Sequence, residues 1–460
     1  MKHTSTLFLI AANVLLIACT QSNGAEMTSN AKSTSPVPAL VERTSNVGVA
    51  SETAQLHKTY ANLKDRLSKQ PDDLKSWIKL SEVFITEARI TGNYGPNYDV
   101  ATSILDKVLE QTSSEKKREI RSEALTLKAV IKLSEHQFEE ARSLGEEAIA
   151  LDPNRAFNYG VLVDANVELG DYDKAVVMSD KMVGMRPDLR SYSRVSYLRE
   201  IHGDIPGAIQ AMDMAVKAGY PGAEETSWCR VQLGGIHERN GDLAKANEQY
   251  MQALAERGDY PFALAAAGRV AGKQKDFAKA ETFLNDAIKR MPDAHFHADL
   301  ARVYAAQNKQ EDYTQELAIT EDILVGLSGA HDHSEGADHA SHGHSHEVGL
   351  EMARFELEFH KDLPVALANA EHEFEHREKN IDVNAAMAAI LYANGDIGAA
   401  QTHLDMAKAT GSKSADLLLI DGLIRIAKGD KANGKKLVKA AFAQDPYLQH
   451  ALAVEGRAVI

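Results

Sequence analysis

The stretch Gly170-Asp171-Tyr172-Asp173-Lys174-Ala175 decides the fold, because similar stretches return along the chain. In each, a Gly-Asp or Lys-Asp pair precedes a large apolar residue, and alanine follows three residues later. The first four of these alanines are separated by 33, 38 and 34 residues. A maintained period of this length indicates a repeat array. The other copies begin at Gly203, Gly241, Lys275 and Gly395.

Small residues recur between these turns, at places where two helices would cross. Backbones approach closely only where side chains are small, and larger apolar residues fill the space between neighbouring hairpins. The pattern therefore predicts pairs of antiparallel helices. The small positions are Ala129, Gly234, Gly268, Ala301, Ala388 and Gly422 in first helices, and Ala148, Ala215, Ala253, Ala287, Ala407 and Ala441 in second helices.

This pattern resembles the tetratricopeptide repeat (TPR), a helical hairpin with a ~34-residue period. The resemblance implies an all-α, right-handed α-solenoid of about nine hairpins over nearly all of residues 52–455. It also implies a concave groove, lined by first helices, that related arrays use to bind peptides or protein surfaces. The segment 89–98, with Gly92, Gly95 and Pro96, is expected to be an insertion inside the first clear hairpin.

The N-terminus has the layout of a secretory signal over residues 1–18, with Lys2 before an apolar run from Leu7 to Ile17. That run is shorter than the ~20 residues that a membrane-spanning helix needs. Leu16-Ile17-Ala18-Cys19 resembles the lipobox of bacterial lipoproteins, in which the signal is cut before a cysteine that then carries acyl chains. The resemblance implies lipidation of Cys19. An ordinary signal peptide with an incidental cysteine is the alternative.

The residue after the cysteine is Thr20 and not Asp, which in related lipoproteins favours the inner membrane. We therefore expect an outer-membrane lipoprotein that faces the periplasm. Residues 19–51 are rich in Ser, Thr and Asn with few large apolar residues, which predicts a flexible stalk.

Composition narrows the choice of partners. The formal net charge is −15, whereas a nucleic-acid-binding protein would normally carry a basic stripe. Cys229 is the only cysteine besides Cys19, so no disulfide framework is available if Cys19 is lipidated. We expect a protein partner, no nucleic acid, and stability that comes from packing.

A histidine-rich segment interrupts the repeat at residues 326–349. Neutral imidazole is a good ligand for zinc, nickel and copper ions, and several rings in a short loop can face one ion. The Gly, Ser and Ala between them cannot form a core, so we expect a loop that orders when metal binds. A solvated insertion and a pH-responsive loop remain as alternatives. The expected ligands are His331, His333, His339, His342, His344 and His346.

A second constellation, His372-Glu373-Phe374-Glu375-His376, matches the spacing of the zinc metallopeptidase helix. In that family the two histidines bind zinc and the glutamate acts as general base. We discount catalysis, because Glu375 and Arg377 are charged where that family usually has uncharged residues. His372 and His376 are instead expected to be an auxiliary ligand pair, or a solvated face. His295 and His297 stay unassigned.

These patterns predict five segments and one leading function. The segments are a signal at 1–18, a stalk at 19–51, a TPR array at 52–325, the loop at 326–349 and further TPR hairpins at 350–460. The predicted function is an envelope scaffold that binds protein partners in its groove and metal ions in its loop, without enzymatic activity. A plain assembly or secretion scaffold with incidental histidines is the alternative, and a zinc peptidase is the least favoured.

Overall fold

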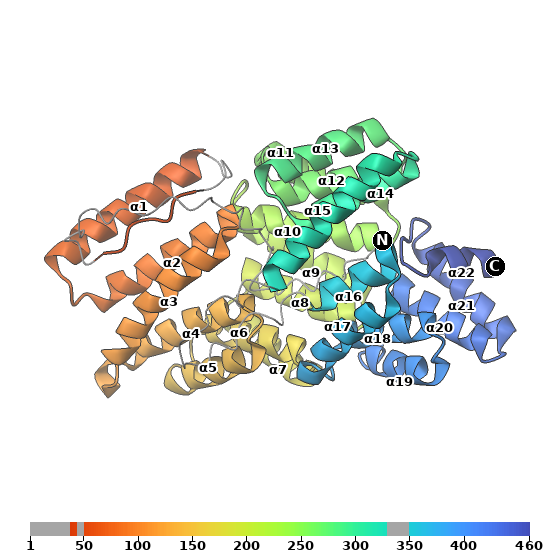
Figure 1. Ribbon diagram of the computed structural model, residues 1–460. Coiled ribbons are helices and arrows are strands. Elements are labelled where there is room, and N and C mark those ends of the chain that lie inside the picture. Colours follow the sequence, from red (N-terminus) through yellow and green to blue (C-terminus); the bar gives the residue numbers. More distant parts are fainter. Residues whose placement is uncertain (1–36, 44–49, 329–348) are drawn as a thin grey trace, which may run out of the picture.

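The computed structural model describes residues 37–43, 50–328 and 349–460. Within these residues the chain forms 22 α-helices, and successive helices pair as antiparallel hairpins that stack side by side (Figure 1). The predicted all-α, TPR-like solenoid is therefore confirmed. The described part contains ten such hairpins, one more than we expected, together with single helices at both ends.

Seven hairpins precede the histidine-rich segment, and one 3₁₀ turn lies at Glu115–Lys117. The helices of this part are α1 (Ala50–Lys69), α2 (Leu74–Thr91), α3 (Tyr94–Glu110), α4 (Arg118–Ser134), α5 (Phe138–Leu151), α6 (Ala156–Glu168), α7 (Tyr172–Met185), α8 (Leu189–Ile201), α9 (Ile205–Ala218), α10 (Glu224–Arg239), α11 (Leu243–Glu256), α12 (Pro261–Lys273), α13 (Phe277–Arg290), α14 (Ala294–Ala306) and α15 (Gln310–Ser328).

Three hairpins and a final helix follow that segment. A π-helical turn at Glu356–His360 extends the first of their helices. The helices are α16 (Gly349–Phe355), α17 (Leu363–His376), α18 (Ile381–Ala393), α19 (Ile397–Ala407), α20 (Ala415–Ala427), α21 (Lys431–Gln444) and α22 (Ala453–Val459).

The repeated Gly-Asp turn combines a helix stop with a helix start. Gly203 has a φ of +80°, a left-handed conformation that glycine adopts without a steric penalty. The carboxylate of Asp204 then accepts a hydrogen bond from the backbone N–H of Gly207 at 3.0 Å, which caps the next helix. Where lysine replaces glycine, Lys275 takes a φ of +65° and Asp276 still caps its helix.

The small residues lie at the crossings of paired helices, as their spacing in the sequence predicted. All nine alanines named for these positions are fully buried, with 0% of their surface exposed. At Gly234, an added Cβ would lie 2.3 Å from a ring carbon of Tyr250. At Gly422, it would lie 2.8 Å from the carbonyl oxygen of Gly434. Close helix crossing therefore depends on these residues.

The expectation of an insertion at 89–98 was wrong. Helix α2 ends at Thr91, Gly92 takes a φ of +71° as its C-cap, and α3 begins at Tyr94. Pro96 lies in the first turn of α3, where a backbone N–H has no partner within the helix. The segment is the turn of the first hairpin, and its glycine and proline serve that turn.

A short stretch inside the range expected to be a stalk packs against the first helices. Val37 is buried, and the hydroxyl of Tyr60 in α1 donates a hydrogen bond to the carbonyl of Pro38 at 2.7 Å. Arg43 forms an ion pair with Glu87 of α2. Residues 37–43 thus contribute apolar contacts and one ion pair to the start of the array.

The later hairpins return to contact the earlier ones, so the solenoid closes on itself. Helices α16 to α18 lie beside α7, α8 and α9 in Figure 1. Gly170, Gly203 and Gly241, in the turns after α6, α8 and α10, approach Lys379, Gly411 and Gln444 respectively. We call this contact, between those three turns and the loops before α18, before α20 and after α21, the seam.

A buried ionic network joins the two sides of the seam. Arg377, just after α17, donates hydrogen bonds to Glu168 of α6 at 2.8 Å and to Glu373 of α17. The side-chain amide of Asn380 donates to the carbonyl of Glu168 at 3.0 Å, and the backbone N–H of Ile381 donates to the hydroxyl of Tyr172 at 2.8 Å. Residues about two hundred positions apart are therefore hydrogen-bonded neighbours.

Candidate functional site

One cavity of about 380 Å³ lies at the seam, and a larger one of about 680 Å³ lies along the first six hairpins. The larger cavity, hereafter the groove, is lined mainly by α2, α4, α6, α8, α10 and α12, which are the first helices of their hairpins. The start of α3 and the end of α7 contribute Tyr94, Met182 and Met185. The apolar lining of the groove includes Tyr94, Phe157, Met185, Leu189, Trp228 and Phe262.

Ion pairs cross the groove. Arg89 of α2 donates to Glu224 at 2.5 Å and to Glu225 at 3.4 Å, and both acids belong to α10. Arg190 of α8 donates to Glu225 at 2.7 Å and lies over the ring of Phe157. Burial alone would raise the pKa of Glu225, but Arg190 and Arg89 hold it below its usual value. The groove thus combines aromatic surface with a charged rim of both signs.

The floor of the groove contains a buried ion pair. Arg194 of α8 donates to both carboxylate oxygens of Asp164 in α6, at 2.9 and 2.6 Å. Burial raises the pKa of Asp164 to about 6, although Arg194 opposes that shift. The pair holds two neighbouring first helices in register beneath the groove.

Seven of the predicted site residues lie outside the described residues. They are the lipidation candidate Cys19 and the metal-ligand candidates His331, His333, His339, His342, His344 and His346.

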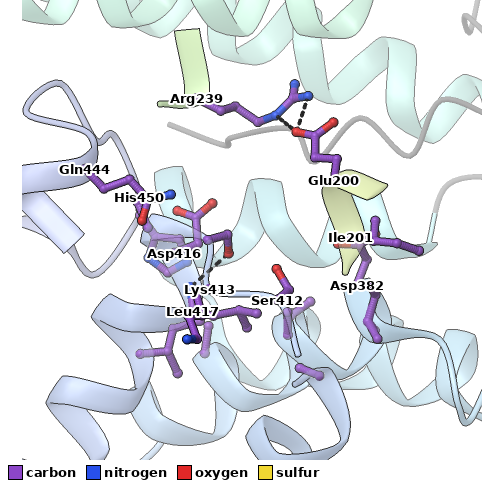
Figure 2. A pocket seen from close by; sticks show the side chains of 18 of the residues that line it. Glu200, Ile201, Arg239, Asp382, Ser412, Lys413, Asp416, Leu417, Gln444 and His450 are labelled. Atoms are coloured by element: carbon purple, nitrogen blue, oxygen red, sulfur yellow. Dashed lines mark hydrogen bonds and ion pairs between the residues drawn. The ribbon is translucent and has the colours of Figure 1, made fainter. Parts of the chain in front are cut away.

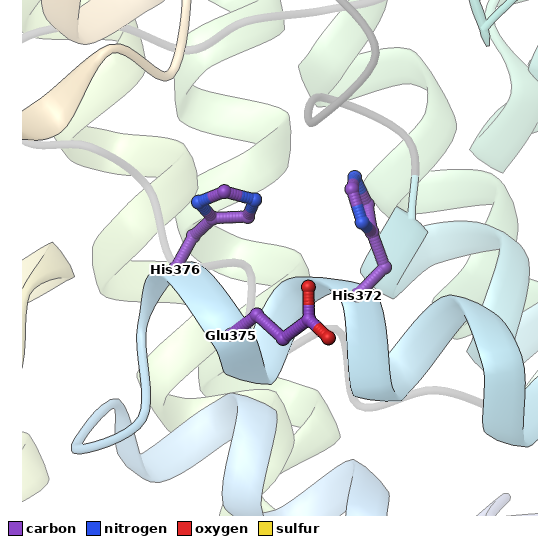
Figure 3. A group of neighbouring side chains, drawn as sticks. All are labelled: His372, Glu375 and His376. Carbon is purple, nitrogen blue, oxygen red and sulfur yellow. The ribbon is translucent and has the colours of Figure 1, made fainter.

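The auxiliary histidine pair lies within the described residues, on α17. The rings of His372 and His376 have their centroids 5.2 Å apart, and one ligand atom each from these residues and Glu375 lie within 4.8 Å of one another. Figure 3 shows both imidazoles rising from one side of α17, with the Glu375 carboxylate near their bases. Two imidazoles and a carboxylate make a ligand set that suits zinc, nickel or copper ions.

Glu373 occupies the position of the general base in the metallopeptidase pattern, but here it is an ion-pair partner of Arg377. Its side chain is buried, and its Oε2 accepts two hydrogen bonds from Arg377, at 3.1 and 2.5 Å. Ala366 and Ala370, on the packed side of α17, are fully buried. A carboxylate that is held by an arginine in the seam cannot take a proton from a metal-bound water on the exposed face.

A second group with three potential metal ligands flanks the histidine-rich segment. Glu321 of α15 and Glu356 and His360 of the π-helical turn bring one ligand atom each within 4.8 Å of one another. Glu356 is buried, and burial raises its pKa. Its carboxylate already lies 3.3 Å from His360 Nδ1.

The two unassigned histidines join helices. His295 Nε2 lies 3.0 Å from Glu351 of α16, and its Nδ1 lies 3.3 Å from Asp293. Burial would lower the pKa of His295, but these two carboxylates raise it to about 10, so its ring is charged at neutral pH. His297 lies 2.6 Å from Glu316 of α15. Both residues therefore connect α14 to its neighbours.

The smaller cavity, which we call the seam pocket, lies at the seam, between α8 and α10 on one side and the hairpins after the histidine-rich segment on the other. Figure 2 shows Glu200 and Arg239, from α8 and α10, on one side, and Asp382, Lys413, Asp416 and His450 on the other. The seam pocket has a volume of about 380 Å³. Its apolar lining includes Ile201, Leu357, Ala385, Ala386, Ala389, Leu417 and Ile420.

Asp382, which lines the seam pocket, has a raised pKa. Asp382 is only 8% exposed, and burial raises its pKa to about 6, against the opposing charges of Arg354 and Arg377. The charges of Glu351 and, to a smaller extent, Asp416 also raise its pKa, which places Asp382 and Asp416 within electrostatic reach of each other.

Sequence patterns did not point to the seam pocket. Asp382 and Asp416 each stand in the first turn of a helix, where an acidic residue is common because it complements the helix dipole. Their proximity depends on the seam, and no local motif encodes it. The groove was predicted as a feature of the fold, but its residues Phe157 and Trp228 were not singled out.

The fold and the groove define a TPR-like helical-hairpin solenoid. No family model and no curated protein matches the chain. Among solved structures, PilF of Pseudomonas aeruginosa aligns with a TM-score of 0.37 and 15% identity over 47% of this chain and 95% of that one. The Cut9–Hcn1 hetero-tetramer of the APC/C gives 0.42 and 13% identity over 77% and 63%. A TPR protein of Parabacteroides merdae gives 0.34 and 15% over 59% and 98%.

These are likenesses of architecture, and the assignment of the fold rests on the hairpins described above. Among the described residues, no helix combines the length and the apolar content that a membrane span requires.

Proposed function

We propose that this protein is a scaffold that binds an extended segment of a partner protein in the groove. The observation that carries the proposal is the lining of the groove, in which the aromatic side chains of Phe157 on α6 and Trp228 on α10 lie partly exposed. Partly exposed aromatic residues in a concave surface are the usual anchors of protein interfaces. The groove occupies a position that solenoid repeats use for binding.

The charged rim suggests the chemistry of the partner. Arg190 and Glu225 pair with each other at the rim, and Lys79 and Arg186 are exposed there. Exposed pairs contribute little to stability, so a partner can exchange them at small cost. We infer a segment with one or two large apolar side chains between charged residues.

Selection of peptides from a random library on the full chain tests this proposal. Trp228→Ala removes an anchor, and Met185→Glu places a charge in the groove at a residue that is 43% exposed. Each change should weaken binding of the selected peptides by about tenfold or more in fluorescence anisotropy. The control Tyr220→Ala, at a residue 84% exposed and outside the groove, should change nothing. Peptides that bind all four proteins equally would refute the proposal.

We further propose that Cys19 is lipidated and anchors the scaffold to the outer membrane, facing the periplasm. The support is the resemblance of residues 16–19 to a lipobox. More than one acyl chain is needed for stable anchoring, because each buried CH₂ adds only ~0.8 kcal/mol. In cells, Cys19→Ala should move the protein from the membrane fraction to the soluble fraction. A variant that stays in the membrane fraction would contradict this anchor.

A second candidate function, metal binding, is favoured by the ligand set on α17. We propose that His331, His333, His339, His342, His344 and His346 bind zinc, nickel or copper ions, with His372 and His376 as an auxiliary site.

Calorimetric titration with Zn²⁺, Ni²⁺ and Cu²⁺ separates these two sites. Deletion of residues 331–346 should remove most of the bound ions, and the double change His372→Ala, His376→Ala should remove one weaker site. His57→Ala, at an exposed histidine of α1, is the matched control. If the deletion leaves the number of bound ions unchanged, the loop histidines are incidental and the plain scaffold is the better description.

A further inference from the structure

The seam pocket contains two carboxylates that the described residues compensate only weakly. Among the described residues, no side chain or backbone group donates a hydrogen bond to the carboxylate of Asp382, and its nearest cation is Arg354, at 3.9 Å. Oδ1 of Asp416 is buried and has no hydrogen-bond partner within the described part of the chain. A carboxylate in such surroundings is costly unless a donor or a cation compensates it.

The cations that line the seam pocket are engaged elsewhere. Arg239 donates to Glu200 through two nitrogens, at 2.8 and 2.6 Å. Arg354 lies closer to Glu351, at 3.2 Å, than to Asp382. Lys413 is exposed at the rim. The pocket therefore presents one carboxylate, Asp382, with a single long ion pair at 3.9 Å, and a second, Asp416, for which the described residues supply no ion pair.

The rest of the lining is apolar and fits a hydrocarbon chain. Ala385, Ala386 and Ala389 form one wall on α18, and Leu417 and Ile420 form another on α20. Alanine leaves space beside a helix that a larger side chain would fill. The cavity volume of about 380 Å³ lies within the range of small-molecule sites, which begins at ~300 Å³.

We propose that the seam pocket binds an alkylammonium group, with its charged nitrogen at Asp382 and Asp416 and its aliphatic chain against the alanines of α18. This chemistry satisfies both features of the pocket, since an ammonium group donates three hydrogen bonds and carries the missing charge. A neutral alcohol of the same length leaves one carboxylate unpaired, and a fatty acid is repelled. The proposal is independent of the groove.

An alkylammonium group belongs either to a free amine or to a lysine side chain of a peptide. Hexylamine represents the free amine, and a short peptide with one central lysine represents the second source. Hexanol and hexanoate are the neutral and the anionic controls. Saturable binding of hexylamine identifies a small-molecule site, whereas binding of the peptide alone identifies a lysine-recognition site. Either result supports the alkylammonium proposal.

The test is calorimetric titration of the full chain with these four probes. Asp416→Asn and Asp382→Asn should each weaken binding of the amine at least tenfold, and Asp405→Asn, an exposed acid outside the pocket, should leave it unchanged. Ala385→Leu fills the cavity without changing its charge and should also abolish binding. Because Ala385→Leu leaves Asp382 in place, it tests the pocket even if Asp382→Asn fails to fold. The helical content of each variant is checked by circular dichroism.

Two outcomes would overturn the proposal. If hexanol binds as tightly as hexylamine, the pocket recognises only the hydrocarbon chain and not the ammonium group. Absence of saturable binding by both amine probes would leave the two carboxylates without a ligand of this class.

Discussion

At the scale of single residues, four nearby side chains on α17 face two different surroundings. His372, Glu375 and His376 lie together on one side, whereas Glu373 turns into the seam and binds Arg377. Spacing alone predicted the histidine pair, because residues four apart share one face of a helix. It could not reveal that Glu373 is buried, since the hairpin that covers it lies about two hundred residues away in sequence.

The pH dependence of stability tests the seam network at Glu168. Burial raises the pKa of Glu168 from 4.5 to about 7, because Arg377 is shared with Glu373 and compensates it only in part. Between these two values the folded protein holds a proton that the unfolded chain has lost. Stability must therefore fall as pH rises from 4.5 to 7, by at most about 3 kcal/mol from this residue.

Glu168→Gln removes the contribution of this carboxyl to the pH dependence of stability, while the amide oxygen of the new side chain can still accept a hydrogen bond. We expect the urea midpoint of the wild-type protein to fall more steeply between pH 4.5 and 8 than that of the variant. Asp164 and Asp382, whose pKa values burial raises to about 6, act in the same direction but are present in both proteins. Parallel midpoint curves would contradict the assignment.

At the scale of elements, the hairpins were the most predictable feature. A left-handed glycine, a capping aspartate and a small residue at the crossing are all local signals, and each repeats with the hairpin. The error at residues 89–98 has the same origin. Gly92 ends α2 in the same way as the other turns, but no aspartate follows it, so the turn was taken for an insertion.

Gly422→Ala tests the requirement for a small residue at a helix crossing. Its Cβ would lie 2.6 Å from Val438 Cγ2 and 2.8 Å from the carbonyl oxygen of Gly434, so α20 and α21 must move apart. We expect a loss of about 1–3 kcal/mol, measured by thermal unfolding. Gly184→Ala, in α7 with no atom within 4 Å of the added Cβ, is the matched control and should be neutral or slightly stabilising. Equal effects at the two sites would argue against steric control of the crossing.

At the scale of the whole molecule, the seam departs from a simple solenoid. Repeats in such arrays normally contact only their sequence neighbours. Here the hairpin α6–α7 contacts the end of α17 and the start of α18, which belong to hairpins five and six places further along. Whether a solenoid meets itself depends on small rotations that accumulate from one hairpin to the next. The period of the sequence therefore predicts the hairpins but neither the seam nor the pocket that it encloses.

The seam has a matched pair of glycines that tests whether it forms in solution. Gly170 and Gly395 both take left-handed φ values, +77° and +84°, in equivalent Gly-Asp turns. Alanine at either position therefore carries the same conformational cost of about 1–2 kcal/mol. Only at Gly170 would the added Cβ meet another part of the chain, 2.5 Å from the backbone of Lys379.

Gly170→Ala should consequently open the seam, whereas Gly395→Ala should leave it closed. We expect faster amide hydrogen exchange at Asn380 and Ile381 and a larger radius of gyration in X-ray scattering for the first variant alone. Because the walls of the seam pocket come from both sides of this contact, the same variant should also lose alkylammonium binding. If the two variants exchange and scatter alike, the hairpins α6–α7 and α18–α19 do not hold each other in solution.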